Sequence, residues 1–318
     1  MENKPFGKLG QVSALALGGG GLGQLWGPTS RDEAVATVRQ AVDSGITFLD
    51  SAPRYGDGEA ESVIGAAFDG RLPAGVMVST KCQLGDPGPD QVFPLLEQSL
   101  TASLARMKLD RVDIFFLHSM IIPDDALGRY QGTTQSLFDE WVRPAFQRLV
   151  SQGRVGAWGI TGIGVPDAVL KALTTQPPPD AIQVIANLLD SPGGLKRYQE
   201  PARPREIAGA AQARGMALMG IRAVQAGALT DALDRELPAD HPETVDYQRA
   251  APFRELAKEA GESPASLAHR YALSMDGIAT LVLGVKNRDE LQECLDAEAK
   301  GRLDPGLMAR IDQAVAGS

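Results

Sequence analysis

The segment ITFLDSAPRY (Ile46–Tyr55) decides the fold, because a short apolar run ends there in an aspartate and a tyrosine follows closely. Two later runs have the same form. VMVSTK (Val76–Lys81) ends in a lysine, and VDIFFLH (Val112–His118) ends in a histidine. Each run is typical of a fully buried strand in a parallel sheet. The C-terminal ends of such strands share one rim, so polar groups gathered there indicate chemistry rather than packing.

The alternation of strands and helices continues outward from these runs. Further apolar runs predict strands at Ala14–Leu17, Val155–Thr161, Ala181–Asn187, Met216–Ala223 and Ile278–Val285. Helices are expected at Thr29–Ser44, Glu59–Phe68, Pro89–Met107, Leu137–Gln152, Asp167–Thr175 and Arg205–Arg214, with two more in Val245–Ser274. Eight strands with helices between them favour a closed (β/α)8 TIM barrel over an open Rossmann sheet. We therefore expect residues 1–318 to form a single domain, with a short N-terminal hairpin at Gly7–Val12.

The composition is typical of a soluble globular protein, with 43% hydrophobic and 22% charged residues. A net charge of −9 argues against nucleic acid and anionic membranes as partners. No apolar run approaches the roughly 18 residues of a membrane-spanning helix, and the N-terminus MENKPFGKLG lacks the apolar core of a signal peptide. Cys82 and Cys294 lie far apart, which suggests free thiols, a cytoplasmic location and no metal site. No sequence feature sets the oligomeric state.

Three long connections follow strands and should lie on the C-terminal face as lids or binding loops: Gly20–Thr29, Met120–Thr134 and Thr230–Glu243. We expect Trp26, in the first of them, to frame a substrate pocket together with Tyr55 and His118. The third connection carries five acids: Asp231, Asp234, Glu236, Asp240 and Glu243. These acids should repel anions, so neutral substrates are expected over carboxylate-bearing ones.

The four polar residues at the rim suit acid–base chemistry. A free phenol has a pKa of about 10 and is a poor proton donor at neutral pH. An ammonium at Lys81 would lower the pKa of Tyr55, and Asp50 would be the counter-ion that a buried lysine needs. His118 adds a hydrogen-bond donor for a carbonyl oxygen, or a proton relay. The structural alternative is a buried Asp–Lys pair, a loop tyrosine and a histidine that caps a strand.

Several motifs resemble the signature of the aldo-keto reductases. FLDSAPRYG (Phe48–Gly56) is followed by ESVIG (Glu61–Gly65), and then by STK (Ser79–Lys81), DIFFLH (Asp113–His118) and QGRVGAWGIT (Gln152–Thr161). Order, spacing and strand context all agree, and the similarity extends from about Gly7 to Ala299. The resemblance implies a (β/α)8 barrel that works as an NAD(P)(H)-dependent oxidoreductase.

The family's Asp–Tyr–Lys–His tetrad falls on Asp50, Tyr55, Lys81 and His118. The resemblance implies that a nicotinamide delivers hydride to an aldehyde or ketone carbon while Tyr55, assisted by His118 and Lys81, protonates the oxygen. In the reverse direction Tyr55 is the base, and an alcohol or lactol is oxidised. No metal is required.

The resemblance also implies contacts with the nicotinamide. Gly18, Gly20 and Gly23 have the G-x-G-x-x-G spacing of a dinucleotide fingerprint, but no helix is expected to open at the third glycine, so the match is weak. In the family picture Gly19 and Gly20 let the backbone approach the nicotinamide. Gln183 matches the residue that holds the carboxamide, and the alternative is a core glutamine satisfied within the protein.

Other expected contacts depart from the family pattern. Thr161–Gly162 replaces a usual Ser-Asn pair, and Ile221 replaces an aromatic residue that often stacks on the nicotinamide. Arg222 stands where a small residue is usual. It either reaches the pyrophosphate as a charge-assisted donor or pairs with Asp231 or Asp234.

The segment LGVKNRDELQEC (Leu283–Cys294) resembles the family's adenosine-phosphate binding region. The matching contact positions are Gly284, Lys286, Arg288 and Glu293. NADPH carries a 2′-phosphate that needs cations, which the lysine and the arginine supply, whereas Glu290 repels it. We therefore expect NADP(H) to be favoured and NAD(H) to be tolerated. The alternative is a solvated helix N-terminus, where acids need no ligand to explain them.

Two other functions stay open. A nicotinamide-binding barrel can work as a redox-sensing regulatory subunit with little turnover, which an NADPH turnover assay against a carbonyl panel distinguishes. An unrelated barrel lyase or isomerase would use Lys81 as a Schiff-base nucleophile, which borohydride trapping tests. The leading hypothesis is a carbonyl reductase or alcohol dehydrogenase that acts on a small molecule.

Overall fold

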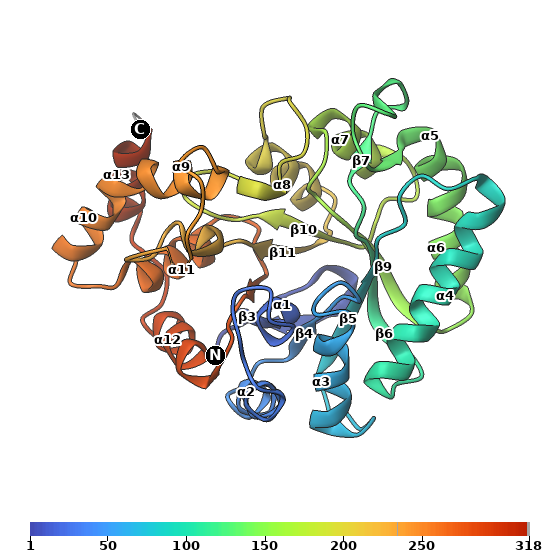
Figure 1. Cartoon of the computed structure of the whole chain (residues 1–318), viewed down its shortest axis with the longest axis horizontal. Helices are drawn as coiled ribbons and strands as arrows, with labels where there is room; N and C mark the ends of the chain where they lie inside the picture. The colour runs from blue at the N-terminus through green and yellow to red at the C-terminus, as the bar shows by residue number, and fades with distance from the viewer. Residues whose placement is uncertain (234, 317–318) are drawn as a thin grey trace.

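The computed structural model describes residues 1–233 and 235–316, and its centre is a closed barrel of eight parallel strands (Figure 1). The strands are β3 (Leu15–Gly18), β4 (Phe48–Asp50), β5 (Met77–Cys82), β6 (Val112–Leu117), β9 (Val155–Thr161), β10 (Ala181–Ile185), β11 (Ala217–Ile221) and β12 (Thr280–Leu283). They pair in this order, and β12 closes the barrel against β3. This confirms the predicted (β/α)8 architecture.

Helices surround the barrel (Figure 1). The longer ones are α2 (Arg31–Asp43), α3 (Glu59–Phe68), α4 (Pro89–Met107), α6 (Arg143–Ser151), α7 (Pro166–Thr174), α8 (Pro204–Gln212), α9 (Pro242–Arg249), α10 (Ala251–Glu259), α11 (Pro264–Ser274), α12 (Arg288–Ala299) and α13 (Pro305–Val315). Shorter turns are α1 (Gly19–Leu22), α5 (Gln135–Leu137), the π-helix η3 (Phe138–Val142), and the 3-10 helices η1 (Gly7–Leu9), η2 (Asp124–Ala126), η4 (Gly193–Leu195) and η5 (Gln225–Gly227). No helix in the described ranges is long and apolar enough to cross a membrane.

Some elements differ from the sequence prediction. The segment Val245–Ser274 belongs to three helices rather than two, because Pro252 lacks an N–H and sits in the first turn of a new helix, α10. The glycine cluster after β3 forms the short helix α1 instead of a loop. The hairpin pairs β1 (Asn3–Pro5) with β2 (Gln11–Ser13), so much of the predicted segment is its turn. Within the second long connection, Met120–Thr134, β7 (Ile121–Ile122) pairs with β8 (Thr133–Thr134).

The strand register brings the polar residues to one rim. Asp50, the last residue of β4, lies beside Gly18 of β3 and Ser79 of β5. Lys81 lies beside Phe116 of β6, and His118 follows directly after that strand. Parallel strands place their C-terminal ends on the same side, so all these side chains are delivered to the same end of the barrel.

The opposite end of the barrel is filled with apolar side chains. Phe6 and Val12 of the N-terminal hairpin region are fully buried and pack with Phe48 and Phe116 from inside the barrel. The rings of Phe6 and Phe48 meet edge to face, with centroids 5.6 Å apart. The hairpin therefore closes the floor, and access to the barrel interior is from the C-terminal rim.

Candidate active site

A buried ion pair lies at the centre of the rim. The Lys81 ammonium donates to Asp50 Oδ2 over 2.8 Å and to the Ser51 carbonyl oxygen over 2.9 Å. The lysine side chain is fully buried and that of the aspartate is 3% exposed. Buried charges of this kind persist only when they are paired and hydrogen-bonded, so the two residues hold each other in fixed positions.

Two further donors bind the other carboxylate oxygen of the aspartate. Asp50 Oδ1 accepts hydrogen bonds from Ser79 Oγ at 2.6 Å and from Gln183 Nε2 at 2.8 Å. Gln183, predicted to hold a carboxamide, thus positions the catalytic candidate Asp50 in this structure. Ser79 was not among the predicted site residues, although the pairing of β4 with β5 places it directly opposite Asp50.

The tyrosine and the histidine lie against this pair. Lys81 Nζ is 4.9 Å from the centre of the Tyr55 ring. The rings of Tyr55 and His118 meet edge to face at 86°, with centroids 5.9 Å apart. The structure therefore brings together all four of the residues predicted as catalytic, from two strands and the loops that follow two strands.

The pKa of Tyr55 corrects one expectation. Burial raises it above the ordinary value, the ammonium of Lys81 lowers it and the carboxylate of Asp50 raises it, and the net direction is upward. We expected a downward shift, but burial outweighs the effect of the ammonium, and the aspartate 2.8 Å from the ammonium offsets part of its charge. For Lys81, burial lowers the pKa, but Asp50 and Tyr55 outweigh it and hold it above the ordinary value. At rest the tyrosine keeps its proton and the lysine keeps its charge.

His118 is neutral in this setting. Burial lowers its pKa to about 3, with further lowering by the charges of Lys81 and Arg54. A neutral imidazole offers one N–H donor and one acceptor nitrogen. Its Nδ1 atom is buried and has no hydrogen-bond partner within the described part of the chain. The histidine is therefore able to bond an incoming polar group.

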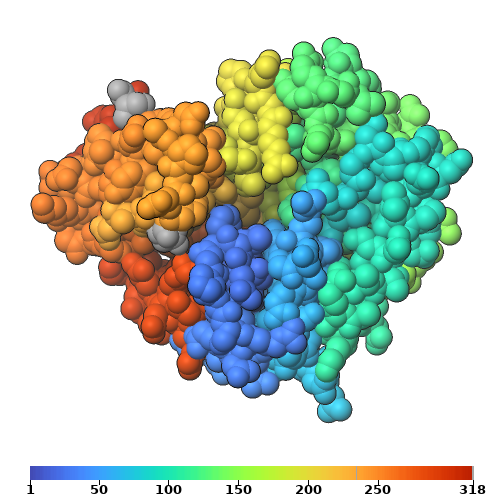
Figure 2. Space-filling model, in the orientation of Figure 1, coloured from blue at the N-terminus to red at the C-terminus, as the bar shows by residue number. Residues whose placement is uncertain are grey.

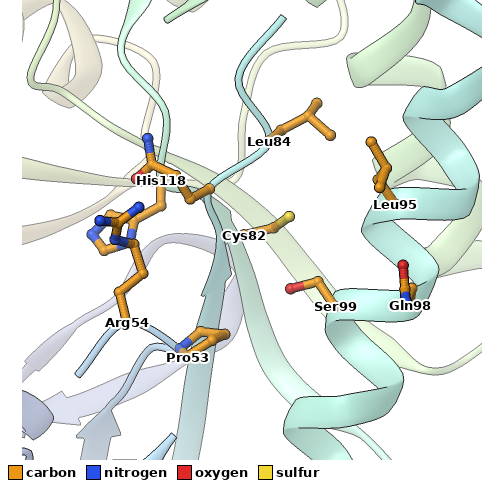
Figure 3. A pocket seen from close by; sticks show the side chains of 9 residues that line it. Pro53, Arg54, Cys82, Leu84, Leu95, Gln98, Ser99 and His118 are labelled. Atoms are coloured by element: carbon orange, nitrogen blue, oxygen red, sulfur yellow. The ribbon is translucent and has the colours of Figure 1, made fainter. Parts of the chain in front are cut away.

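A cavity of about 280 Å³ opens next to His118 (Figure 3). It is lined by Pro53, Arg54, Cys82, Gln83, Leu84, Leu95, Gln98, Ser99 and His118. Sequence reasoning placed only His118 here. Arg54 stood inside the quoted motif, directly before Tyr55, and its charge was the signal that was passed over.

Trp26 packs over two glycines at the rim. It does not line the cavity beside His118; its indole Nε1 is 2.8 Å from the place where a Cβ at Gly20 would be, and 3.1 Å from that place at Gly284. The indole covers these two glycines because neither has a side chain to hold it off. Gly19 has a different role: a Cβ there would meet Tyr55 Cδ2 at 3.2 Å, so the glycine leaves room for the tyrosine ring.

Arg222 is held by an internal partner. Its guanidinium donates to Glu243 Oε1 over 2.6 Å and to Gln225 Oε1 over 2.9 Å. Burial lowers its pKa against the opposing effect of Glu243. The partner is neither of the two aspartates considered from the sequence, of which Asp234 lies outside the described residues. The arginine is thus committed to Glu243 rather than directed at a pyrophosphate.

The remaining nicotinamide candidates lie at the ends of inner strands. Thr161 ends β9, and its hydroxyl donates to the Leu117 carbonyl over 3.4 Å. The amide of Gly162 donates to the Gln183 carbonyl over 2.7 Å, and a Cβ at Gly162 would come within 2.9 Å of that oxygen. Ile221 is half-buried at the end of β11. The position of Gly162 therefore requires glycine.

Both cations at the start of α12 have acidic partners. Lys286 Nζ lies 2.8 Å from Glu290, and Arg288 lies 3.0 Å from Glu33 of α2. Glu293, expected to contact adenine, is exposed and accepts a hydrogen bond from Ser263 at 2.7 Å. A phosphate bound here would have to compete with the two carboxylates for the cations.

The residues at this part of the rim are compatible with a bound dinucleotide. Gly20 and Gly284 form a floor without side chains just beyond the adjoining strands β3 and β12, and the Trp26 indole lies over this floor in the structure. Lys286 and Arg288 stand at the N-terminus of α12, where the helix dipole favours a phosphate. Figure 2 shows this face recessed between the blue N-terminal residues and the orange residues of the C-terminal half. Among the residues that the structure describes, no cluster of three or more His, Cys, Asp or Glu side chains suits a metal ion.

The cysteines take no part in this site as nucleophiles. Both are free and buried. Cys294 Sγ lies 3.6 Å from His269 Nε2, but burial raises the pKa of the thiol and lowers that of the imidazole. A reactive pair needs thiolate and imidazolium, so this pair is structural.

Comparison with known proteins identifies the family pattern. The model of the Aldo/keto reductase family matches residues 14–316. L-galactose dehydrogenase of Arabidopsis thaliana is 28% identical over 92% of this chain and 86% of its own. A probable voltage-gated potassium channel subunit beta of the same plant is 23% identical over 99% and 97%. The structure of a glycerol dehydrogenase from Gluconobacter oxydans superposes with a TM-score of 0.75 at 21% identity, covering 99% of this chain and 95% of that chain.

Proposed function

Because this chain belongs to the aldo/keto reductase family, we propose that it reduces an aldehyde or ketone to an alcohol, or catalyses the reverse, with Tyr55 as general acid or base. The observation that carries the proposal is the packing of Tyr55 and His118 against a buried Lys81–Asp50 pair with a 2.8 Å separation. A bound nicotinamide would supply or accept the hydride. The other steps belong to the protein.

Tyr55 and His118 handle the substrate oxygen in this proposal. Burial keeps the tyrosine protonated, so it has a proton to give when negative charge develops on a carbonyl oxygen. The neutral histidine donates a second hydrogen bond to the same oxygen. Lys81 stabilises the phenolate that remains, because its charge is fixed beside the ring, and Asp50 holds the lysine in place.

The dinucleotide would bind over Gly20 and Gly284 in place of the Trp26 indole, which would have to move aside, with Thr161 and Gln183 at the nicotinamide end. NADP(H) is the proposed cofactor, since Lys286 and Arg288 can both bind a 2′-phosphate. Glu33 and Glu290 oppose that preference, because each carboxylate already binds one of these cations. NAD(H) is therefore also accepted in this proposal. A cytoplasmic location is proposed with it, on the basis of the free cysteines.

The test measures NADPH and NADH oxidation with a panel of aldehydes and ketones, for wild type and Tyr55→Phe. The proposal expects turnover by wild type and its loss in the variant, with cofactor binding retained. A wild-type protein that binds NADPH but turns over no carbonyl compound would instead support a regulatory role, which the likeness to a potassium channel subunit beta keeps as the second candidate.

A further inference from the structure

Arg54 is a lining residue of the cavity and has no partner in the described part of the chain. The loop after β4 carries it, directly before Tyr55, and its side chain is exposed. Within residues 1–233 and 235–316 it makes no ion pair or hydrogen bond, whereas Lys81, Arg222, Lys286 and Arg288 are all paired. An arginine presents five donors in a planar fork that matches a carboxylate.

None of the described residues that line the cavity around this arginine is an acid. Its nine lining residues include two glutamines, a serine and a histidine but neither aspartate nor glutamate. Figure 3 shows Arg54 reaching from its loop toward the His118 imidazole. In a protein with a net charge of −9, this cavity is a local positive region next to a residue of the tetrad.

We propose that Arg54 is a specificity-determining residue that binds the carboxylate of the substrate, so that the enzyme acts on oxo acids or aldehyde acids. This rests on the proposed function. The carbonyl carbon gains hydride from the reduced nicotinamide, the carbonyl oxygen gains the proton of Tyr55, and the carboxylate stays unchanged in its ion pair with Arg54. In the reverse direction a hydroxy acid is oxidised.

This inference reverses the preference for neutral substrates that the acidic segment Thr230–Glu243 suggested. No described acid of that segment lines the cavity. Glu243 instead pairs with Arg222 and with His241. Exposed acids outside the cavity are screened beyond roughly 8–10 Å at physiological salt, so the nearby arginine dominates the field that a bound substrate meets.

The experiment compares succinic semialdehyde with butanal, which has the same carbon chain and no carboxylate. Wild type should have a kcat/KM at least tenfold higher for the acid. Arg54→Met should lower that ratio by about 10- to 100-fold, as expected for loss of a hydrogen-bonded charge pair. Arg54→Lys should keep part of the preference, because the charge remains and the planar fork is lost.

A matched control and a binding measurement separate the possible failures. Arg71→Met removes the same charge from the exposed turn after α3, away from the cavity, and should leave the ratio unchanged. Calorimetry with succinate, which has no reducible carbonyl, in the presence of NADP⁺ should show at least tenfold tighter binding to wild type than to Arg54→Met. Equal succinate binding, or a ratio that Arg54→Met leaves unchanged, overturns the carboxylate site. Failure of wild type to reduce either aldehyde while it binds succinate through Arg54 contradicts the proposed function alone.

Discussion

Replacing Lys81 by methionine should destabilise the protein in a way that depends on pH. The change removes the ammonium that lies 2.8 Å from Asp50, in a place where both side chains are at most 3% exposed. Breaking a buried ion pair by removing one partner costs about 3–5 kcal/mol. We expect the lower end, about 3 kcal/mol, because Ser79 and Gln183 still donate to the carboxylate.

The pH dependence follows from the carboxylate that remains. Without the ammonium, the pKa of Asp50 in the folded variant should rise above its value of about 3.9 in the unfolded chain. The folded variant then binds a proton that the unfolded chain does not, so the variant loses stability as pH rises above that value. The deficit relative to wild type should therefore be larger at pH 8 than at pH 5.

Urea unfolding of wild type, Lys81→Met, Asp50→Asn and the double variant at the two pH values measures this effect. The double variant should recover stability relative to Lys81→Met, because it no longer buries an unpaired carboxylate. If Lys81→Met unfolds within about 0.5 kcal/mol of wild type at both pH values, as a surface substitution would, the argument from the buried pair is refuted.

Three further predictions concern the histidine, a glycine and the cofactor end. The pKa of His118 falls from 6.5 to about 3 because the residue is buried beside cations, so the free energy of unfolding should decrease as pH falls from 6.5 toward 3. His118→Asn should reduce this pH dependence in urea unfolding experiments. An unchanged pH dependence in the variant would contradict the prediction. Gly19→Ala should displace the Tyr55 ring, because the new Cβ would lie 3.2 Å from Tyr55 Cδ2. The variant should have a kcat lower by about tenfold or more, with little change in NADPH binding as measured by fluorescence titration. Glu33→Gln should free Arg288 and lower the KM for NADPH more than that for NADH; equal effects on both would argue against a 2′-phosphate contact.

Local patterns of apolar residues predicted the parts of the fold that depend on burial. The runs around Phe48, Phe115 and Ile160 are apolar on both faces because helices outside and side chains inside bury them, which made the strands recognisable. The structure confirms the helix predicted around Glu59–Phe68 (α3) and the one predicted at Pro89–Met107 (α4), where proline occupies the first helical position. The common location of the four tetrad residues could be predicted from the strand order, because the C-terminal ends of parallel strands lie at one rim.

Contacts between distant segments lay beyond those patterns. Nothing in the sequence near Arg222 or Arg288 indicates that Glu243 or Glu33 is its partner, because the fold alone brings these pairs together. The prediction assigned Trp26 to the substrate pocket from the position of its loop, whereas the indole lies in the space that Gly20 and Gly284 leave open because they have no side chains. The direction of the Tyr55 pKa shift needed the extent of burial, which outweighs the lysine and is set by the packed structure.

The central claim is that Tyr55 transfers the proton to and from the substrate oxygen. Tyr55→Phe keeps the ring that packs against Gly19 and His118 and removes only the hydroxyl. Single-turnover oxidation of bound NADPH by a reactive aldehyde, measured together with the NADPH dissociation constant, tests the claim directly. The claim predicts a rate lower by roughly 10²- to 10⁴-fold and a dissociation constant within about twofold of wild type. A rate close to that of wild type, at unchanged NADPH affinity, would contradict it.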